Sequence, residues 1–128
     1  MPHAIFEDLF VLEMASNHQG SLERGLEIVN KFSKIIRFNN IKAAIKLQFR
    51  DMDNFVHKDF VNRLDIRYVK RVNDTRLSKE DFAVLVDAIR KSGCMPMATP
   101  FDEKSVDWCF EFDIPIIKVA SADNNDWK

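Results

Sequence analysis

The segment Ile114–Ser121 reads Ile-Pro-Ile-Ile-Lys-Val-Ala-Ser, an apolar run interrupted by one lysine and closed by a serine. A short apolar run rich in β-branched residues predicts a buried strand. Removing an ammonium group from water is unfavourable, so a lysine in the middle of such a strand is either strained or placed to bind an anion. Lys118 is therefore the first candidate site residue.

A second strand of the same design is predicted upstream. The segment Lys42–Phe49 reads Lys-Ala-Ala-Ile-Lys-Leu-Gln-Phe. Because side chains alternate along a strand, Lys46 and Gln48 share one face, and the larger apolar residues share the other. Each of the two strands thus carries a lysine on one face, and we expect the fold to bring Lys46 and Lys118 together.

The composition limits the class of protein. The 128 residues are 46% hydrophobic and 30% charged, which is typical of one globular domain with a real core. The net charge of −1 gives no global attraction for nucleic acid or for an anionic membrane. No apolar run approaches the roughly 20 residues of a membrane span, no signal-peptide pattern opens the chain, and two cysteines are too few for a disulfide framework. We expect a cytoplasmic protein that contacts neither nucleic acid nor membrane.

Strands and helices alternate along the chain, and capping residues mark the helix ends. Ser21 and Asp102 are expected N-caps, Ser78 with Asp81 is expected to form a capping box, and Asn40 suits a left-handed helix end. The predicted order is strand 9–15, helix 21–37, strand 43–49, an irregular excursion over about 50–77 with a short helix near 58–64, helix 78–91, strand 94–99, helix 102–112 and strand 114–121.

This alternation predicts an α/β fold with parallel strands joined by right-handed crossovers. An open sheet would bury both faces in apolar contacts, whereas one face here carries Glu13, Lys46, Gln48 and Lys118. Polar residues at the carboxyl ends of strands are typical of a (β/α)8 TIM barrel, which needs eight strands and about 250 residues. We therefore expect residues 1–128 to form about the first four strands, a half or truncated barrel, either as part of a longer protein or completed by association.

Seven polar side chains are expected at the strand ends. They are Glu13, Lys46, Gln48, Thr99, Lys118, Ser121 and Asp123. Two lysines with hydroxyl and amide donors fit an anion that carries both phosphate and carboxylate. Glu13 then either holds a neutral hydroxylated co-substrate or forms an interior ion pair with Lys46 or Lys118.

Other reactive residue types have simpler interpretations. His18 is either a metal ligand or base, or a hydrogen-bonding residue of its loop. Cys94 and Cys109 have no histidine nearby in the sequence, which favours buried structural thiols over nucleophiles. The basic residues of the segment 70–76 are interpreted as a solvated face. The sequence contains no glycine-rich phosphate loop and no paired Cys or His spacing for a metal.

Four segments resemble motifs of the sialic acid synthase (N-acetylneuraminate synthase) family, in order and at the expected strand ends. Glu13–Gly20 resembles E-I-G-x-N-H-x-G, and Ile45–Gln48 resembles V-K-x-Q. Ala98–Asp102 resembles S-T-P-F-D, and Ile114–Ser121 resembles I-P-x-x-K-I-x-S. Together these motifs cover most of the chain outside residues 50–77.

The resemblance implies a barrel enzyme that condenses phosphoenolpyruvate with an N-acetylmannosamine-type sugar and releases phosphate. The residues that it implies for phosphoenolpyruvate are Lys46, Thr99, Lys118 and Ser121. The residues that it implies at the reacting centre and sugar are Glu13 and Gln48. It also implies a divalent metal, manganese or magnesium, that polarises the sugar aldehyde, with ligands on later strands and none in these residues. Barrels of this family commonly pair, so a homo-oligomer is expected.

Three departures from the motifs bear on the identity of the sugar. Ala15 replaces a glycine, Phe49 stands where threonine is common, and Asp123 stands where a glutamate often contacts the sugar. Two rival functions stay open. Lys118 could form a Schiff base in an aldolase, or the chain could be a non-catalytic half-barrel that binds or assembles through its exposed strand edges.

Overall fold

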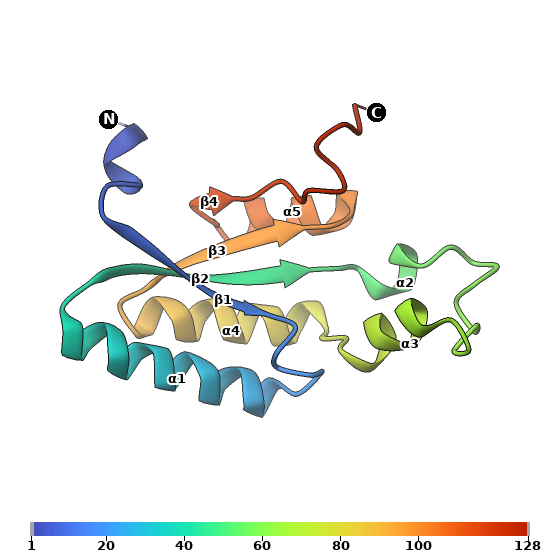
Figure 1. Ribbon diagram of the computed structural model, residues 1–128, viewed down its shortest axis with the longest axis horizontal. Coiled ribbons are helices and arrows are strands. Elements are labelled where there is room, and N and C mark those ends of the chain that lie inside the picture. Colours follow the sequence, from blue (N-terminus) through green and yellow to red (C-terminus); the bar gives the residue numbers. More distant parts are fainter. Residues whose placement is uncertain (1, 128) are drawn as a thin grey trace.

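The computed structural model describes residues 2–127 and shows four parallel strands in one sheet, in the order β1-β2-β3-β4 (Figure 1). The predicted α/β class with parallel strands is thereby confirmed. In chain order the elements are the 3-10 helix η1 (Pro2–Ile5), β1 (Leu9–Ala15), α1 (Leu22–Asn39), β2 (Lys42–Phe49), α2 (Met52–Phe55), α3 (Arg67–Asp74), α4 (Lys79–Lys91), β3 (Met95–Pro100), α5 (Glu103–Glu111) and β4 (Ile116–Ile117).

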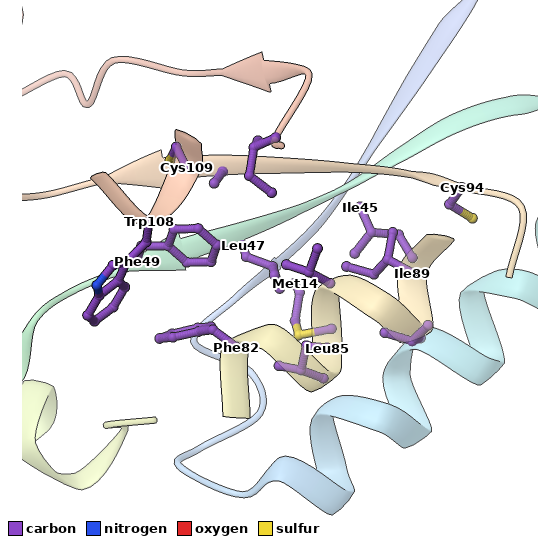
Figure 2. Close-up of a cluster of buried hydrophobic side chains, with 14 of the residues drawn as sticks. Met14, Ile45, Leu47, Phe49, Phe82, Leu85, Ile89, Cys94, Trp108 and Cys109 are labelled. Carbon is purple, nitrogen blue, oxygen red and sulfur yellow. The ribbon is translucent and has the colours of Figure 1, made fainter. Parts of the chain in front are cut away.

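The core lies between the sheet and α1, α4 and α5. The β2 side chains Ile45, Leu47 and Phe49 are fully buried in one apolar cluster, to which α4 contributes Leu85 and α5 contributes Trp108. Figure 2 shows these side chains meeting on the helix side of the sheet. Because one face of β2 is committed to this cluster, alternation turns Lys46 and Gln48 to the opposite face.

The predicted helix ends are confirmed by their capping bonds. The Ser21 hydroxyl accepts from the backbone N–H of Arg24, and Ser78 forms a reciprocal capping box with Asp81. The Asp102 carboxylate accepts from the N–H of Ser105 at 2.7 Å. Asn40 ends α1 with φ of 49°, in the left-handed region. These caps satisfy backbone groups that a helix end leaves unpaired.

The fourth strand is shorter than predicted. Its ladder spans only Ile116–Ile117, although the Lys118 N–H still donates to the Ala98 carbonyl at 2.9 Å. In a parallel ladder the Lys118 carbonyl would next accept from the residue after Thr99, which is Pro100 and has no N–H. The prediction of a buried strand through Ser121 is therefore wrong, and Val119 is exposed.

The excursion between β2 and α4 contains two helices where one was predicted, and neither lies at the predicted position. The helix predicted near residues 58–64 is absent, and residues 58–62 form turns. Helices occur instead at α2 and α3, and α3 is anchored by the buried side chains of Val69 and Val72. In Figure 1 both helices lie beyond the carboxyl end of β2. The excursion therefore places residues of α3 at the end of the sheet where the candidate site lies.

No helix within residues 2–127 is both long enough and apolar enough to cross a membrane.

Candidate functional site

Strand register assembles five of the seven predicted site residues on the sheet face opposite the helices. Glu13 pairs with Lys46 across β1 and β2, and Gln48 pairs with Thr99 across β2 and β3. The backbone hydrogen bond from Lys118 to Ala98 continues the β3–β4 register, so that Lys118 lies beside Thr99. Gln48, Thr99 and Lys118 thus form one row near the carboxyl ends of the strands, and the Glu13–Lys46 pair lies in the row before it.

Glu13 and Lys46 form an ion pair, one of the two arrangements left open by the sequence. The Lys46 ammonium lies 2.5 Å from the Glu13 carboxylate. The Lys46 side chain is only 13% exposed, whereas that of Glu13 is 44% exposed. The largely buried ammonium is therefore compensated by an acid that substrate and solvent can still reach.

Lys118 differs from Lys46 because no carboxylate neutralises it among the described residues. Its ammonium donates only to the backbone carbonyl of Val119, at 3.3 Å, and takes part in no ion pair. The predicted burial of this lysine is wrong, since the side chain is partly exposed. An uncompensated, reachable ammonium beside the buried Thr99 is suited to bind an incoming anion.

Ser121 and Asp123 lie apart from this row, in the turn that follows β4. Ser121 is exposed and Asp123 is partly buried. The Asp123 backbone closes the turn by donating to the Ala120 carbonyl at 3.0 Å. Within residues 2–127 neither side chain forms an ion pair or hydrogen bond with the other candidates, so their substrate contacts stay predictions.

Arg50 is a site residue that the sequence analysis missed. Its Nη1 donates to Gln48 Oε1 at 3.2 Å, and its guanidinium lies over the Phe101 ring, 4.0 Å from the ring centre. Burial lowers the pKa of Arg50 most, Tyr68 opposes that shift, and the nearby Arg71 adds to it. The available signal was its spacing: Arg50 follows Gln48 by two residues and so continues the polar face of β2.

His18 supports the loop after β1, in line with the simpler of its two interpretations. It is 2% exposed, and its Nδ1 accepts the Gly20 N–H at 3.0 Å, which assigns the proton to Nε2. Burial, and then the charge of Arg50, lowers the pKa of His18 below its ordinary value of 6.5. A neutral imidazole therefore fixes the loop that begins two residues after Glu13.

Two of the departures from the family motifs have structural consequences. Ala15 has φ of 48°, in the left-handed region, and a shift of strand register lies between Glu13 and Ala15. A glycine would meet no steric penalty there, so its replacement is a source of strain. Phe49 is fully buried on the helix side, 4.9 Å from Phe82 between ring centres. Our expectation that Phe49 bears on the sugar is therefore wrong, because its side chain faces away from the site.

The described residues do not fit a metal ion. Within residues 2–127 no three His, Cys, Asp or Glu side chains come together to hold one. Cys94 and Cys109 are buried, and burial raises the pKa of the Cys109 thiol to about 11. The Cys109 thiol is therefore a poor nucleophile and a poor metal ligand, because the thiolate is the reactive form. The chemistry that this face offers is thus anion binding by ammonium, guanidinium and hydroxyl groups next to a carboxylate.

Known proteins share this architecture. A protein of Chromobacterium violaceum named for spore coat polysaccharide biosynthesis (protein E) matches with a TM-score of 0.88 and 39% identity, over 94% of this chain and 36% of that one. N-acetylneuraminic acid (sialic acid) synthetase of Leptospira borgpetersenii serovar Hardjo-bovis matches with a TM-score of 0.71 and 24% identity, over 91% of this chain and 36% of that one.

Sequence comparison agrees with the structural likeness. An uncharacterized protein of Methanocaldococcus jannaschii is 30% identical over 118 residues, covering 91% of this chain and 32% of that protein. The chain thus spans about a third of the length of these relatives. Residues 39–128, well over half of the chain, match the NeuB family. By this match the chain belongs to the NeuB family.

Proposed function

We propose that this chain supplies four strands, and the helices that follow the first three, of an enzyme that condenses phosphoenolpyruvate with an N-acetylmannosamine-like sugar, giving a nonulosonic acid and inorganic phosphate. Membership of the NeuB family and the likeness to a sialic acid synthetase support the proposal. The observation that carries it is the row of Gln48, Thr99 and Lys118, in which the lysine has no carboxylate partner among the described residues.

In this proposal the row binds phosphoenolpyruvate. The Lys118 ammonium and the Thr99 hydroxyl face the phosphate or the carboxylate, and Lys46 adds positive charge one row earlier. Lys46 and Thr99 lie on strands, and the Lys118 backbone is held by its hydrogen bond to Ala98, so little backbone reorganisation is needed as charge moves in the reaction. Ser121 and Asp123 would approach from the turn after β4, Ser121 toward phosphoenolpyruvate and Asp123 toward the sugar.

Glu13 and Gln48 would act at the reacting carbons. The enol carbon of phosphoenolpyruvate attacks the sugar aldehyde, which gains a proton and becomes a hydroxyl. Water then adds to the cationic carbon, which still carries the phosphate, and loses a proton. The bond from this carbon to the phosphate oxygen breaks, phosphate departs with the bonding electrons, and the new hydroxyl loses its proton to become the keto group of the product. In this proposal the Glu13 carboxylate, which is 44% exposed, takes the proton from water, and the Gln48 amide orients the sugar.

The divalent metal implied by the family would polarise the aldehyde oxygen when bound. The described residues do not fit a metal, so its ligands would have to come from outside them. Four strands make half of an eight-stranded ring. We therefore expect this chain by itself to bind phosphoenolpyruvate without turnover, and the pairing of complete barrels and a cytoplasmic location remain proposals.

Calorimetric titration with phosphoenolpyruvate tests the anion site. We expect binding that Lys118→Ala abolishes and that Lys34→Ala, at an exposed lysine of α1, leaves unchanged. Equal binding by all three proteins would place the anion elsewhere and remove the basis of the proposal. Should the folded chain not bind at all, the same titration on a chain extended to eight strands decides whether the missing strands or the lysine assignment is responsible.

A Schiff-base aldolase using Lys118 is the rival enzyme. That chemistry requires a desolvated, neutral amine, whereas Lys118 is partly exposed and donates to a carbonyl. We expect no borohydride-trapped adduct with pyruvate, as judged by intact mass. An adduct lost in Lys118→Ala would favour the aldolase.

A further inference from the structure

The excursion between β2 and α4 forms one wall of an open groove at the carboxyl end of the sheet. Residues of α3 line one side, and residues of the loop after β1 line the other, around a volume of about 610 Å³. The lining residues are Ser16, Asn17, Gln19, Arg67, Lys70, Arg71, Asp74 and Thr75. The groove therefore begins where the strand bearing Glu13 ends.

The groove carries an excess of positive charge that its own acid does not cancel. Asp74 is paired with Lys70 at 2.5 Å, and these are exposed neighbours on α3. Arg67 and Arg71 are exposed, and within residues 2–127 their guanidinium groups make no ion pair or hydrogen bond, although the backbone carbonyl of Arg71 accepts from Thr75. The interpretation of segment 70–76 as a solvated face thus suits Lys70, but it does not account for the unpaired guanidinium of Arg71 or for that of Arg67, which precedes the segment.

Arg50 is a third guanidinium group that interacts electrostatically with Arg71, although it does not line the groove itself. Arg71 lies close enough to Arg50 to disfavour its charged form, and the Arg50 Nε is buried without a hydrogen-bond partner in the described structure. The Asp102 carboxylate favours the charged form of Arg50, and an oxyanion bound at Arg71 would likewise offset the repulsion between the two guanidinium groups. Arg50 also binds Gln48, so the charged region reaches the candidate reacting centre.

The polar groups opposite the arginines are available as further donors. Gln19 uses its Oε1 to accept from Arg24 at 3.1 Å, which leaves its amide hydrogens free for a ligand. Ser16 contributes a hydroxyl at the groove wall. Two guanidinium groups on one side of the groove and neutral donors on the other can together donate several hydrogen bonds to the oxygens of a carboxylate or phosphate.

We propose that this groove, with Arg67 and Arg71 as its main ligands, binds a carboxylate or phosphate group carried by the sugar that condenses with phosphoenolpyruvate. This inference rests on the proposed function, and it narrows the second substrate to an acidic sugar or a sugar phosphate. The anion of phosphoenolpyruvate is bound separately, at Lys118. The excursion is thus the element that selects the sugar.

The test compares three sugars on the folded 128-residue chain by calorimetry: N-acetylmannosamine, its 6-phosphate and the corresponding uronic acid. We expect at least one charged sugar to bind about tenfold or more tightly than the neutral one, as charge-assisted hydrogen bonds allow. Whichever of the two charged sugars binds more tightly identifies the source of the oxyanion. Equal affinities for all three sugars, or no binding of either charged sugar, would overturn the proposal.

The variants Arg71→Gln and Arg67→Gln assign the binding to the groove. Each should lower the affinity for the charged sugar about tenfold, whereas Arg37→Gln, at an exposed arginine in the last turn of α1, should leave that affinity unchanged. In NMR spectra of the parent chain, the N–H signals of arginine side chains should shift as the charged sugar is added. The spectrum of Arg71→Gln should lack the signal that shifts. If Arg37→Gln weakened binding of the charged sugar as much as Arg71→Gln does, the binding would be nonspecific attraction to positive charge, and the proposal would be overturned.

Phosphoenolpyruvate separates this inference from the proposed function. Its binding should depend on Lys118 and not on Arg71, and the charged sugar should show the reverse dependence. Phosphoenolpyruvate binding lost in Arg71→Gln would assign the groove to phosphoenolpyruvate and overturn the inference alone. The opposite result would be a complete barrel that binds the charged sugar through Arg71 and does not bind phosphoenolpyruvate. That result would support the assignment of the groove and refute the proposed condensation.

Discussion

The ammonium of Lys46 lies 2.5 Å from the carboxylate of Glu13, so the first two strands are joined by charge on the sheet face that the helices leave open. Lys118, two strands away, has no such partner among the described residues. The two lysines that the sequence treats as equivalent therefore differ: one is compensated by an acid, and the other is available to an anion.

Glu13→Gln should raise the affinity of the chain for phosphoenolpyruvate several-fold. The substitution removes a negative charge next to an anion site and frees the ammonium of Lys46 for the ligand. Calorimetry measures the affinity, with Glu7→Gln, at an exposed glutamate before β1, as the control. A loss of affinity in Glu13→Gln would instead show that the acid holds Lys46 in its binding position.

Ala15→Gly should stabilise the fold by up to about 1 kcal/mol, because glycine occupies left-handed backbone without the penalty of a Cβ. The measurement is the free energy of unfolding in urea. Ala88→Gly, inside α4, is the matched control and should destabilise by a similar amount. Equal destabilisation by both substitutions would mean that the bulge at Ala15 carries no strain.

Stability should fall as the pH drops below 6.5 because of His18. Its pKa is lowered in the folded state, so the unfolded chain binds more protons and acid favours unfolding. The loss begins near the ordinary value of 6.5 and ends once the pH is below the folded-state pKa.

Urea unfolding between pH 8 and pH 5 measures this dependence. His18→Asn keeps an oxygen that can accept from Gly20 but removes the titration, so its stability should change less over this range. His57→Asn, at an exposed histidine, should retain the full dependence. The same slope in His18→Asn and the parent chain would assign the acid sensitivity to other groups.

Phe49→Ala should destabilise the fold by about 3 to 5 kcal/mol, as expected for a large aromatic side chain removed from a packed core. Phe38→Ala is the control, since Phe38 is 90% exposed and should change stability by less than about 0.5 kcal/mol. The free energy of unfolding is the measurement. A sugar-specific binding defect in Phe49→Ala without a loss of stability would contradict its place in the core.

Much of the fold could be predicted because its signals are local. Ser78 and Asp81 lie three residues apart and make their capping bonds to each other, so the sequence alone predicts where α4 begins. The strand Leu9–Ala15 and the burial of Leu85 likewise follow from composition and periodicity. The rows of Glu13 with Lys46 and of Gln48 with Thr99 follow from alternation once the strands are parallel.

The misses depend on residues that are distant in the sequence. The length of β4 is limited by Pro100, which cannot donate to a strand that begins 16 residues later. The proximity of Arg50 to Arg71 depends on where Val69 and Val72 anchor α3, and charged residues on a short helix look the same whether or not they face a groove. The sequence contains the residue types for the site, whereas the packing of the excursion decides which of them meet.

The order of the strands in the sheet equals their order in the chain. A strand emerging during synthesis therefore finds its pairing partner already made, and each closure spans only the intervening helix and loops. The entropic cost of closing a loop rises slowly with its length, and in this order each strand pairing closes only one such connection. Assembly can thus follow translation by the stepwise addition of βα units, with the core around β2 as the surface on which later units settle.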